Sequence, residues 1–277
     1  MIVDTQLNQL RGLIDESDAI LVGAGAGMSI PAGIDLDDRE AFKKNYPAMT
    51  QYGFEYGYQL LGYPYQDDKL RWGYLSASLM DSARLGRDET YQNLKTVLAD
   101  KNHFIMTTNV DRLFYKNGFD GDKIYTPQGD SFLFQCKTPC SQDVWDALPL
   151  LKEMEQHIDP ETQMLTDDKY VPTCPHCGGE VYMNVRSGPF YISKHYEPQH
   201  ERLNQWLTDI AGKKLLLLEI GVGFNTPGVI RAPFEHLAKQ IPNCTLVRIN
   251  PKDAHGPEGT LSVQQGIKET LSSLVSA

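Results

Sequence analysis

Residues 19–29 read AILVGAGAGMS, an apolar run that passes directly into a glycine turn. Four apolar residues between Asp18 and Gly23 are typical of a strand that is buried on both faces. Glycine lets a ligand approach the backbone closely, and free N–H groups at the start of a helix attract phosphate. The stretch therefore predicts a strand, a phosphate-holding turn and then a helix that begins near Ser29.

The glycine spacing differs from that of a standard dinucleotide-binding turn. A G-x-G-x-x-G motif that starts at Gly23 would need glycine where Met28 stands, and one that starts at Gly25 would need it at Ile30. No acidic residue ends a second strand about 20 residues further on, where a hydride-transferring dehydrogenase would carry one. Such an enzyme is disfavoured, and a purely structural turn stays an alternative.

Strands and helices alternate along most of the chain, which predicts an α/β fold with a Rossmann-like doubly wound parallel sheet. Apolar runs predict further strands at residues 103–107, 123–125, 215–220 and 245–249, and amphipathic patterns predict helices at residues 7–15, 91–98, 201–210 and 268–274. In such a sheet, ligands bind beyond the carboxyl ends of the strands. Glycine-rich or polar loops follow the predicted strands at residues 23–29, 107–111, 221–226 and 250–251.

Two segments interrupt this alternation. Residues 36–90 are rich in tyrosine and glycine and predict a mostly helical insertion. Residues 132–195 carry four of the five cysteines and predict a small inserted module. The Rossmann-like domain then comprises residues 1–131 and 196–277.

The cysteines form two closely spaced pairs. Three residues separate Cys136 from Cys140, and two separate Cys174 from Cys177. Four thiolates in two such knuckles are typical of a tetrahedral structural zinc site that has no open position for catalysis. We expect one zinc ion on these four residues; four unrelated free thiols are the alternative.

Charge and hydropathy limit the classes of partner. The chain has 277 residues with 26 lysines and arginines against 36 acidic residues, a net charge of −10. An acidic chain is a poor general binder of nucleic acid or of an anionic membrane, so we expect neither as a partner. No window approaches the roughly 18 apolar residues of a transmembrane helix. The first residues lack the pattern of a signal peptide, so we expect a cytoplasmic protein with reduced cysteines.

Polar residues follow the predicted strand at 103–107. Asn109 and Asp111 place an amide and a carboxylate two residues apart, beside Thr108. Together they could grip a ribose or a carboxamide, or they could simply cap a helix. Gln128 follows the next short strand, and a lone glutamine is usually a surface residue.

Several motifs resemble those of the sirtuin family. Residues 25–34 read GAGMSIPAGI, which resembles the sirtuin opening motif GAGxSxxAGI, and residues 107–111 read TTNVD, which resembles the sirtuin TQNID loop. The two cysteine pairs are similar to the sirtuin zinc ribbon. Residues 221–223 (GVG) stand where sirtuins have GTS, and residues 249–250 match their IN element. The motifs occur in family order between residues 20 and 268, and the resemblance implies that NAD is the co-substrate.

The chain departs from the sirtuin pattern at two places. Residues 35–39 read DLDDR where sirtuins have PDFR, so only Asp35 can keep a role on the nicotinamide side. The catalytic histidine of deacylating sirtuins is replaced by Gln128. Glutamine has no group that titrates near neutral pH, and general-base help is typically worth roughly 10²–10⁴ in rate. Efficient deacylation is therefore not expected.

The glutamine and the TTNVD loop together resemble the macrodomain-linked (class M) sirtuins of microbes. That resemblance implies an NAD-dependent protein ADP-ribosyltransferase, which releases nicotinamide and transfers ADP-ribose to a protein acceptor. It also implies a lipoylated glycine-cleavage-H-like carrier as the acceptor and an operon-linked macrodomain protein as a partner. The alternatives are an NAD-dependent protein-lysine deacylase, an NAD glycohydrolase and a non-catalytic NAD-binding sensor.

The resemblance also implies the residues of the site. Asn109 and Asp111 would hold the nicotinamide ribose and carboxamide, and Gln128 would orient the ribose hydroxyls; these three are the expected catalytic residues. The turn at 25–29 would hold the pyrophosphate. The full set expected to bind NAD is Ala24, Gly25, Ala26, Ser29, Asp35, Thr108, Asn109, Asp111, Gln128, Gly221, Gly223, Asn225, Asn250 and Ile267.

Overall fold

The computed structural model describes residues 2–276, and its contacts divide the chain into two compact units. The sheet unit comprises the segment up to Ala32, Gly86–Gly129 and the segment from His195 onward. The cysteine unit comprises Gly33–Leu85 and Asp130–Lys194. The helical insertion and the cysteine segment thus belong to one unit, an association that the sequence pattern did not indicate.

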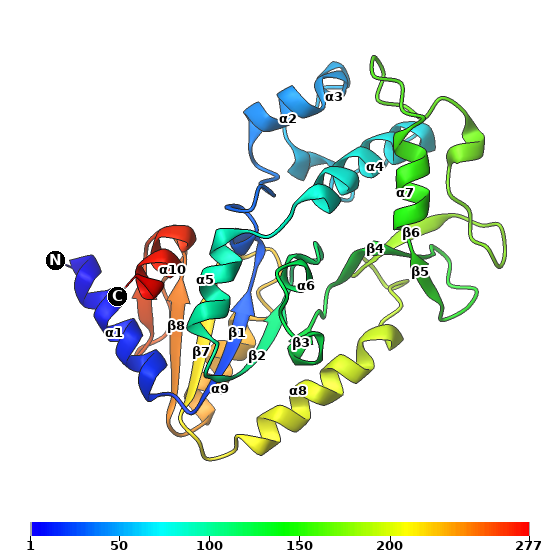
Figure 1. Cartoon of the computed structure of the whole chain (residues 1–277). Coiled ribbons are helices and arrows are strands. Elements are labelled where there is room, and N and C mark those ends of the chain that lie inside the picture. Colours follow the sequence, from blue (N-terminus) through cyan, green and yellow to red (C-terminus); the bar gives the residue numbers. More distant parts are fainter. Residues whose placement is uncertain (1, 277) are drawn as a thin grey trace. The chain divides into compact units, whose positions relative to one another are not determined.

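The sheet unit is built on a six-stranded parallel sheet with the strand order β3-β2-β1-β7-β8-β9 (Figure 1). Its strands are β1 (Ala19–Ala24), β2 (Asn102–Thr107), β3 (Ile124–Tyr125), β7 (Leu215–Ile220), β8 (Cys244–Ile249) and β9 (Leu261–Val263). Numbered along the chain, this is the 3-2-1-4-5-6 order of a doubly wound sheet, in which the order of the strands reverses between β1 and β7. The predicted fold class is confirmed.

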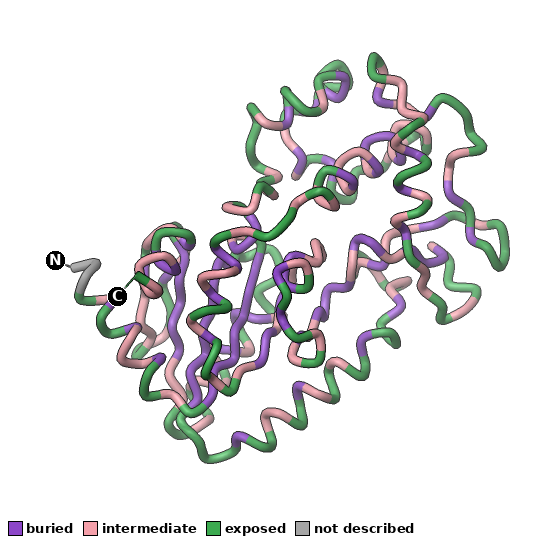
Figure 2. Tube along the Cα trace, viewed as in Figure 1, coloured by how far each residue is buried: buried purple, intermediate pink, exposed green. Residues whose placement is uncertain are grey.

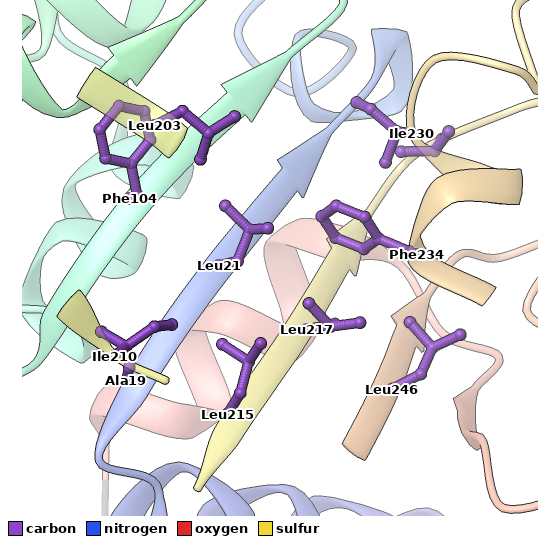
Figure 3. Close-up of a cluster of buried hydrophobic side chains, with 11 residues drawn as sticks. Ala19, Leu21, Phe104, Leu203, Ile210, Leu215, Leu217, Ile230, Phe234 and Leu246 are labelled. Atoms are coloured by element: carbon purple, nitrogen blue, oxygen red, sulfur yellow. The ribbon is translucent and has the colours of Figure 1, made fainter. Parts of the chain in front are cut away.

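Helices cover the sheet because both of its faces are apolar. The helices are α1 (Ile2–Glu16), α5 (Glu89–Val97), α6 (Leu113–Lys116), α8 (Glu197–Asp209), α9 (Arg231–Gln240) and α10 (Ile267–Val275). Alternate strand residues such as Leu21 and Leu217 pack against Leu203 of α8 and Phe234 of α9 (Figure 3). The intervening residues point to the opposite face and are equally buried, so the central strands are buried throughout (Figure 2).

The cysteine unit combines helices with a three-stranded sheet of order β5-β4-β6. The strands are β4 (Gly129–Cys136), β5 (Val144–Asp146) and β6 (Val181–Val185), and the helices are α2 (Arg39–Asn45), α3 (Pro47–Gln51), α4 (Asp68–Arg84) and α7 (Leu148–Glu155). Trp72 of α4 packs edge-on against Phe134 of β4 with ring centroids 5.1 Å apart, beside Leu151 of α7. The expected helical insertion is confirmed, and its long helix shares a core with the small sheet.

Short 3-10 turns complete the fold, and they include one correction. They are η1 (Ala26–Met28), η2 (Gly57–Leu60), η3 (Gly121–Lys123), η4 (Asp168–Tyr170) and η5 (Lys194–Tyr196). The prediction of a helix that begins near Ser29 is wrong, because only η1 follows β1 and the next α-helix begins at Arg39. Pro31 disfavours helical backbone at Ile30, and Gly33 has a φ of +103°.

The ends of other elements also differ from the predictions. Helix α8 begins four residues earlier than expected, at Glu197, and β9 and α9 were not predicted.

Among the described residues, no helix is long and apolar enough to cross a membrane.

The loops after β1 and β7 cross in direct backbone contact. The N–H of Gly25 donates to the carbonyl of Ile220 at 3.0 Å, and the N–H of Gly27 donates to the carbonyl of Gly221 at 3.0 Å. A Cβ on Gly221 would lie 2.7 Å from backbone atoms of Gly27, and Gly221 has a φ of +63°. Glycine is therefore required at the point where the two halves of the sheet meet.

We expect Gly221→Ala to lower the free energy of unfolding by about 2–4 kcal/mol, because the new methyl group meets backbone that cannot move aside and the φ is unfavourable. The matched control is Gly223→Ala, because nothing lies within 4 Å of a Cβ at that position. The control should change stability by less than about 0.5 kcal/mol. Urea unfolding of both variants checks this, and equal midpoints would contradict the close crossing.

Candidate functional site

The end of β2 is fastened to the end of β1. The N–H of Thr108 and the hydroxyl of Thr107 both donate to the carbonyl of Ala24, at 3.0 and 3.1 Å. The N–H of Asn109 in turn donates to the hydroxyl of Thr107 at 3.1 Å. These contacts bring the TTNVD loop to the glycine turn at the carboxyl edge of the sheet, where doubly wound folds bind ligands.

Four polar side chains meet at this edge. The hydroxyl of Ser29 donates to Oδ2 of Asp111 at 2.5 Å, and Nδ2 of Asn109 donates to Ser29 Oγ at 2.9 Å. The phenol oxygen of Tyr91 lies 3.1 Å from Ser29 Oγ. A serine hydroxyl has one proton, which Asp111 receives, so Tyr91 must be the donor in its contact with Ser29. The polar capacity of Ser29 is thus fully used.

This arrangement fixes what Asn109 can offer a ligand. Its second Nδ2 proton goes to the carbonyl of Gly25 at 2.9 Å, so both of its donors are engaged within the protein. The carbonyl oxygen Oδ1 is the atom that these contacts leave for a ligand. Asn109 can therefore accept a hydrogen bond from a ligand hydroxyl at this position, but it cannot donate one.

Asp111 caps α6, which is one of the two roles that the sequence left open for it. Its Oδ1 accepts the N–H of Leu113 at 2.8 Å at the start of α6, while Oδ2 faces Ser29. Burial raises the pKa of the Asp111 carboxyl above its usual range, and the hydrogen bonds from Ser29 and Leu113 partly offset this rise. Burial also raises the pKa of Tyr91 well above its usual range, which keeps the phenol protonated as a donor.

Gln128 lies in a tight turn after β3. The N–H of Gly129 donates to the carbonyl of Thr126 at 3.0 Å, and the N–H and hydroxyl of Thr126 donate to Oε1 of Gln199 at 2.9 and 3.1 Å. Gln128 is only 8% exposed, so the reading of it as an ordinary surface glutamine is wrong. Because β3 pairs with β2, the turn lies at the same edge of the sheet as the TTNVD loop.

The remaining predicted residues of the sheet unit lie beyond β7 and β8 or at the start of α10. Gly223 and Asn225 are exposed, and Ile267 is buried as the first residue of α10. Asn250 is buried; its Nδ2 donates to the carbonyl of Val222 at 3.1 Å, and its Oδ1 accepts the N–H groups of Lys252 and Asp253, both at 2.9 Å. Its amide thus shapes the two loops that follow these strands.

Asp35 belongs to the other unit, where its carboxylate accepts the N–H of Asp37 at 2.9 Å in a local turn.

The four paired cysteines converge in the cysteine unit. The Sγ atoms of Cys136, Cys140, Cys174 and Cys177 all lie within 4.8 Å of one another. The distance from Cys136 to Cys177 is 3.7 Å and that from Cys140 to Cys174 is 3.6 Å. Four thiolates at about 2.3 Å from a tetrahedral zinc ion stand about 3.8 Å apart, so the cluster fits a structural zinc site. Its tightly bonded turns, such as Gly178 N–H to the Cys174 carbonyl at 2.8 Å, hold the cluster in place.

Comparison with solved structures identifies the fold. The chain aligns with a Sir2–p53 peptide–NAD⁺ complex over 98% of its own length and 97% of that chain, with a TM-score of 0.60 and 15% identity. It aligns with a Sir2 homologue–NAD complex over 97% and 92% of the two chains, with a TM-score of 0.60 and 15% identity. The protein has the fold of the Sir2 sirtuins. The crossing glycine loops and the Ser29–Asn109–Asp111 cluster thus lie within a sirtuin fold, at the carboxyl edge of its parallel sheet.

Sequence comparison finds two relatives that are similar to this chain over most of its length. Over 266 residues, this sirtuin-fold chain is 34% identical to a protein of Fusarium oxysporum f. sp. cubense named probable bifunctional ADP-ribose hydrolase/ADP-ribosyltransferase. The match covers 94% of this chain but only 44% of that relative, so the chain spans less than half of its length. It is 28% identical over 274 residues to a protein ADP-ribosyltransferase of Staphylococcus aureus, covering 98% of this chain and 86% of the relative. No family model matches the chain.

Proposed function

We propose that this protein is an NAD-dependent protein ADP-ribosyltransferase. The observation that carries the proposal is the Ser29–Asn109–Asp111 cluster at the carboxyl edge of a sirtuin sheet, with the non-titrating Gln128 in place of a base. The names of the two relatives, one a protein ADP-ribosyltransferase and the other a bifunctional hydrolase and transferase, support the same activity.

The glycine turns are suited to a pyrophosphate. A Cβ on Gly25, Gly27 or Gly221 would meet the backbone of the opposite loop, so glycine lets the two turns meet at the edge of the sheet where doubly wound folds bind ligands. We propose that the pyrophosphate lies along this edge, with the nicotinamide ribose toward Asn109 and the adenosine toward β8. The complete proposed set is Ala24, Gly25, Ala26, Ser29, Asp35, Thr108, Asn109, Asp111, Gln128, Gly221, Gly223, Asn225, Asn250 and Ile267.

The polar cluster is suited to the departure of nicotinamide. The bond between ribose C1′ and the nicotinamide nitrogen breaks, and its electron pair leaves with nicotinamide. Positive charge then develops at the ribose, where the carboxylate of Asp111 stabilises it. Oδ1 of Asn109 accepts a hydrogen bond from a ribose hydroxyl, which holds the sugar in place.

Gln128 favours transfer over deacylation. Deacylation needs a base on a ribose hydroxyl, and an amide cannot take that proton. In transfer, a nucleophilic atom of the acceptor forms the new bond to C1′ and releases its own proton to solvent. The amide of Gln128 needs only to orient the ribose hydroxyls for this step.

The pH dependence of NAD turnover follows from these two residues. The active form of Asp111 is the carboxylate, and its pKa is raised, so activity should fall on acidification at a higher pH than for an ordinary carboxyl group. Because Gln128 does not titrate, we expect no further loss near pH 6.5, the ordinary pKa of histidine. Gln128→His should introduce that loss. A Gln128→His profile with the same shape as the wild-type profile would contradict the assignment.

Tyr91 is a positioning residue that the sequence did not reveal, because a tyrosine in an amphipathic helix looks like ordinary core. It is fully buried, and its hydroxyl joins the cluster at Ser29, 3.1 Å from Ser29 Oγ. Tyr91→Phe removes one hydrogen bond, worth about 1 kcal/mol, so we expect kcat for NAD to fall about 5-fold. KM should change little, and the zinc content should not change. Unaltered kcat would show that this contact does not position the cluster.

The acceptor that we propose is a lipoylated glycine-cleavage-H-like carrier, with a macrodomain protein encoded in the same operon as the partner and the cytoplasm as the location. The resemblance to class M sirtuins supports these assignments. The hydrolase part of the Fusarium relative's name is consistent with a partner that removes ADP-ribose.

Intact-mass spectrometry of the carrier tests the proposal. We expect lipoylated carrier incubated with the protein and NAD to gain the mass of one ADP-ribose unit, and the unlipoylated carrier to gain none. Conversion of acyl-lysine peptide to O-acyl-ADP-ribose, without carrier modification, would instead support the deacylase. Free ADP-ribose alone would support the glycohydrolase, and no consumption of NAD would leave a binding protein.

A further inference from the structure

A buried ion pair joins two central strands of the sheet unit. Glu219 of β7 and Arg248 of β8 are partners in the strand register, and both are fully buried. Nε of Arg248 lies 2.7 Å from one carboxylate oxygen of Glu219, and Nη2 lies 2.9 Å from the other. The pair is thus bidentate, the strongest geometry for these two groups.

Helix α9 adds a second pair of opposite charges. Arg231, the first residue of α9, lies 3.6 Å from Glu219, and Glu235 lies 3.1 Å from Nη2 of Arg248. Two guanidinium groups therefore face two carboxylates, and their formal charges balance. Three of these charges are buried and Glu235 is partly exposed. Burying charges costs desolvation, and well-packed apolar side chains often serve stability as well or better. Stability alone is thus a weak reason for this network.

The remaining N–H groups of the two arginines reach two loops. Arg231 donates to the carbonyl of Val222 at 3.1 Å, and to those of Asp253 and His255 at 2.8 and 3.0 Å. Arg248 also donates to the carbonyl of His255. One guanidinium, that of Arg231, therefore bridges the loop after β7 and the loop after β8. The ring of Phe224 covers this guanidinium at 4.3 Å and is itself 63% exposed.

We infer that Arg231 is a positioning residue, which holds the loops 221–226 and 250–256 in one arrangement for the phosphate and adenosine side of NAD. The inference rests on the proposed function, since that function assigns these loops to NAD. Only the planar fork of arginine can donate to three carbonyl groups in fixed directions. A lysine at this position would keep the charge but could not reproduce the bridge.

Arg231→Lys tests this inference by hydrogen exchange and by kinetics. Amide exchange should become faster in both loops, 221–226 and 250–256, while the amides of β1 and β7 keep their protection. We expect the affinity for ADP-ribose to fall about 10-fold and KM for NAD to rise by a similar factor, with kcat nearly unchanged. The matched control is Arg202→Lys, because Arg202 lies on α8 and pairs with Asp122 at the surface. The control should alter none of these quantities.

The outcomes separate this inference from the proposed function. If wild-type protein binds ADP-ribose and Arg231→Lys binds it equally well with unchanged loop exchange, the inference is overturned and the proposed function stands. If the variant loses protection throughout the sheet, Arg231 serves overall stability and the inference is again overturned. If wild-type protein binds no ADP-ribose, the proposed function falls, and the inference falls with it.

Discussion

Replacing Asp111 by asparagine should lower the rate of nicotinamide release from NAD by about 10²–10³-fold, as expected for the loss of a charge that stabilises a transition state. Asparagine fills the same space, but it cannot oppose positive charge at the ribose. Affinity for ADP-ribose should change far less than kcat, because the charge develops only as nicotinamide leaves. Steady-state release of nicotinamide, measured for wild type and variant, checks this.

The same substitution should leave the fold intact. Burial raises the pKa of Asp111, so its ionised form is less favourable in the folded protein than in the unfolded chain. The carboxylate therefore costs stability as pH rises above the ordinary carboxyl pKa, and asparagine removes that cost. It also weakens one accepted hydrogen bond, worth about 1 kcal/mol, so the two effects oppose each other. Asp122→Asn, at an exposed surface position, is the control and should retain full activity. Full activity in Asp111→Asn as well would remove Asp111 from the mechanism.

Cys174→Ser should release zinc and unfold the cysteine unit, the largest structural effect that we expect. In zinc-finger peptides the metal contributes roughly 10–16 kcal/mol, so losing one thiolate should cost this unit at least about 5 kcal/mol. The buried Trp72 packs in the same core as Cys136 and Cys174, so its fluorescence should shift to the red as that core opens. Metal analysis and limited proteolysis of residues 130–194 complete the test.

Cys244→Ser is the matched control for this experiment. Cys244 lies at the start of β8 in the sheet unit and is not one of the four clustered cysteines. The control should keep one zinc ion per chain and the wild-type fluorescence. A Cys174→Ser protein that also keeps stoichiometric zinc would contradict the four-thiolate site.

Much of the sheet could be predicted because buried parallel strands leave a simple signal. The apolar run 215–220 coincides with β7, and the predicted strand at 19–22 became β1 with two further residues. Strand β9 was not predicted, because it has only three residues, of which one is fully buried, and no continuous apolar run. The helix predicted after the glycine turn does not form. Pro31 and the left-handed backbone of Gly33 disfavour a helix there, and the glycine pattern alone does not indicate this.

The polar contacts of the site could be predicted only in part. Asn109, Asp111 and Ser29 were singled out by motif, and the structure brings them within hydrogen-bonding distance of one another. Tyr91 and Arg231 have no motif that marks them. The partner of Tyr91 lies 62 residues away along the chain, and the partners of Arg231 lie on two separate loops. Contacts of this kind depend on the tertiary fold, so the spacing of residues along the sequence does not predict them.

The central claim is that ADP-ribose from NAD is transferred to protein. The most direct measurement is the ratio of protein-bound ADP-ribose to released nicotinamide, with NAD labelled in the adenine ring and the lipoylated carrier present in excess. The account predicts a ratio near one for the wild-type protein, with both products strongly reduced in Asp111→Asn. Nicotinamide release without protein-bound label would contradict it.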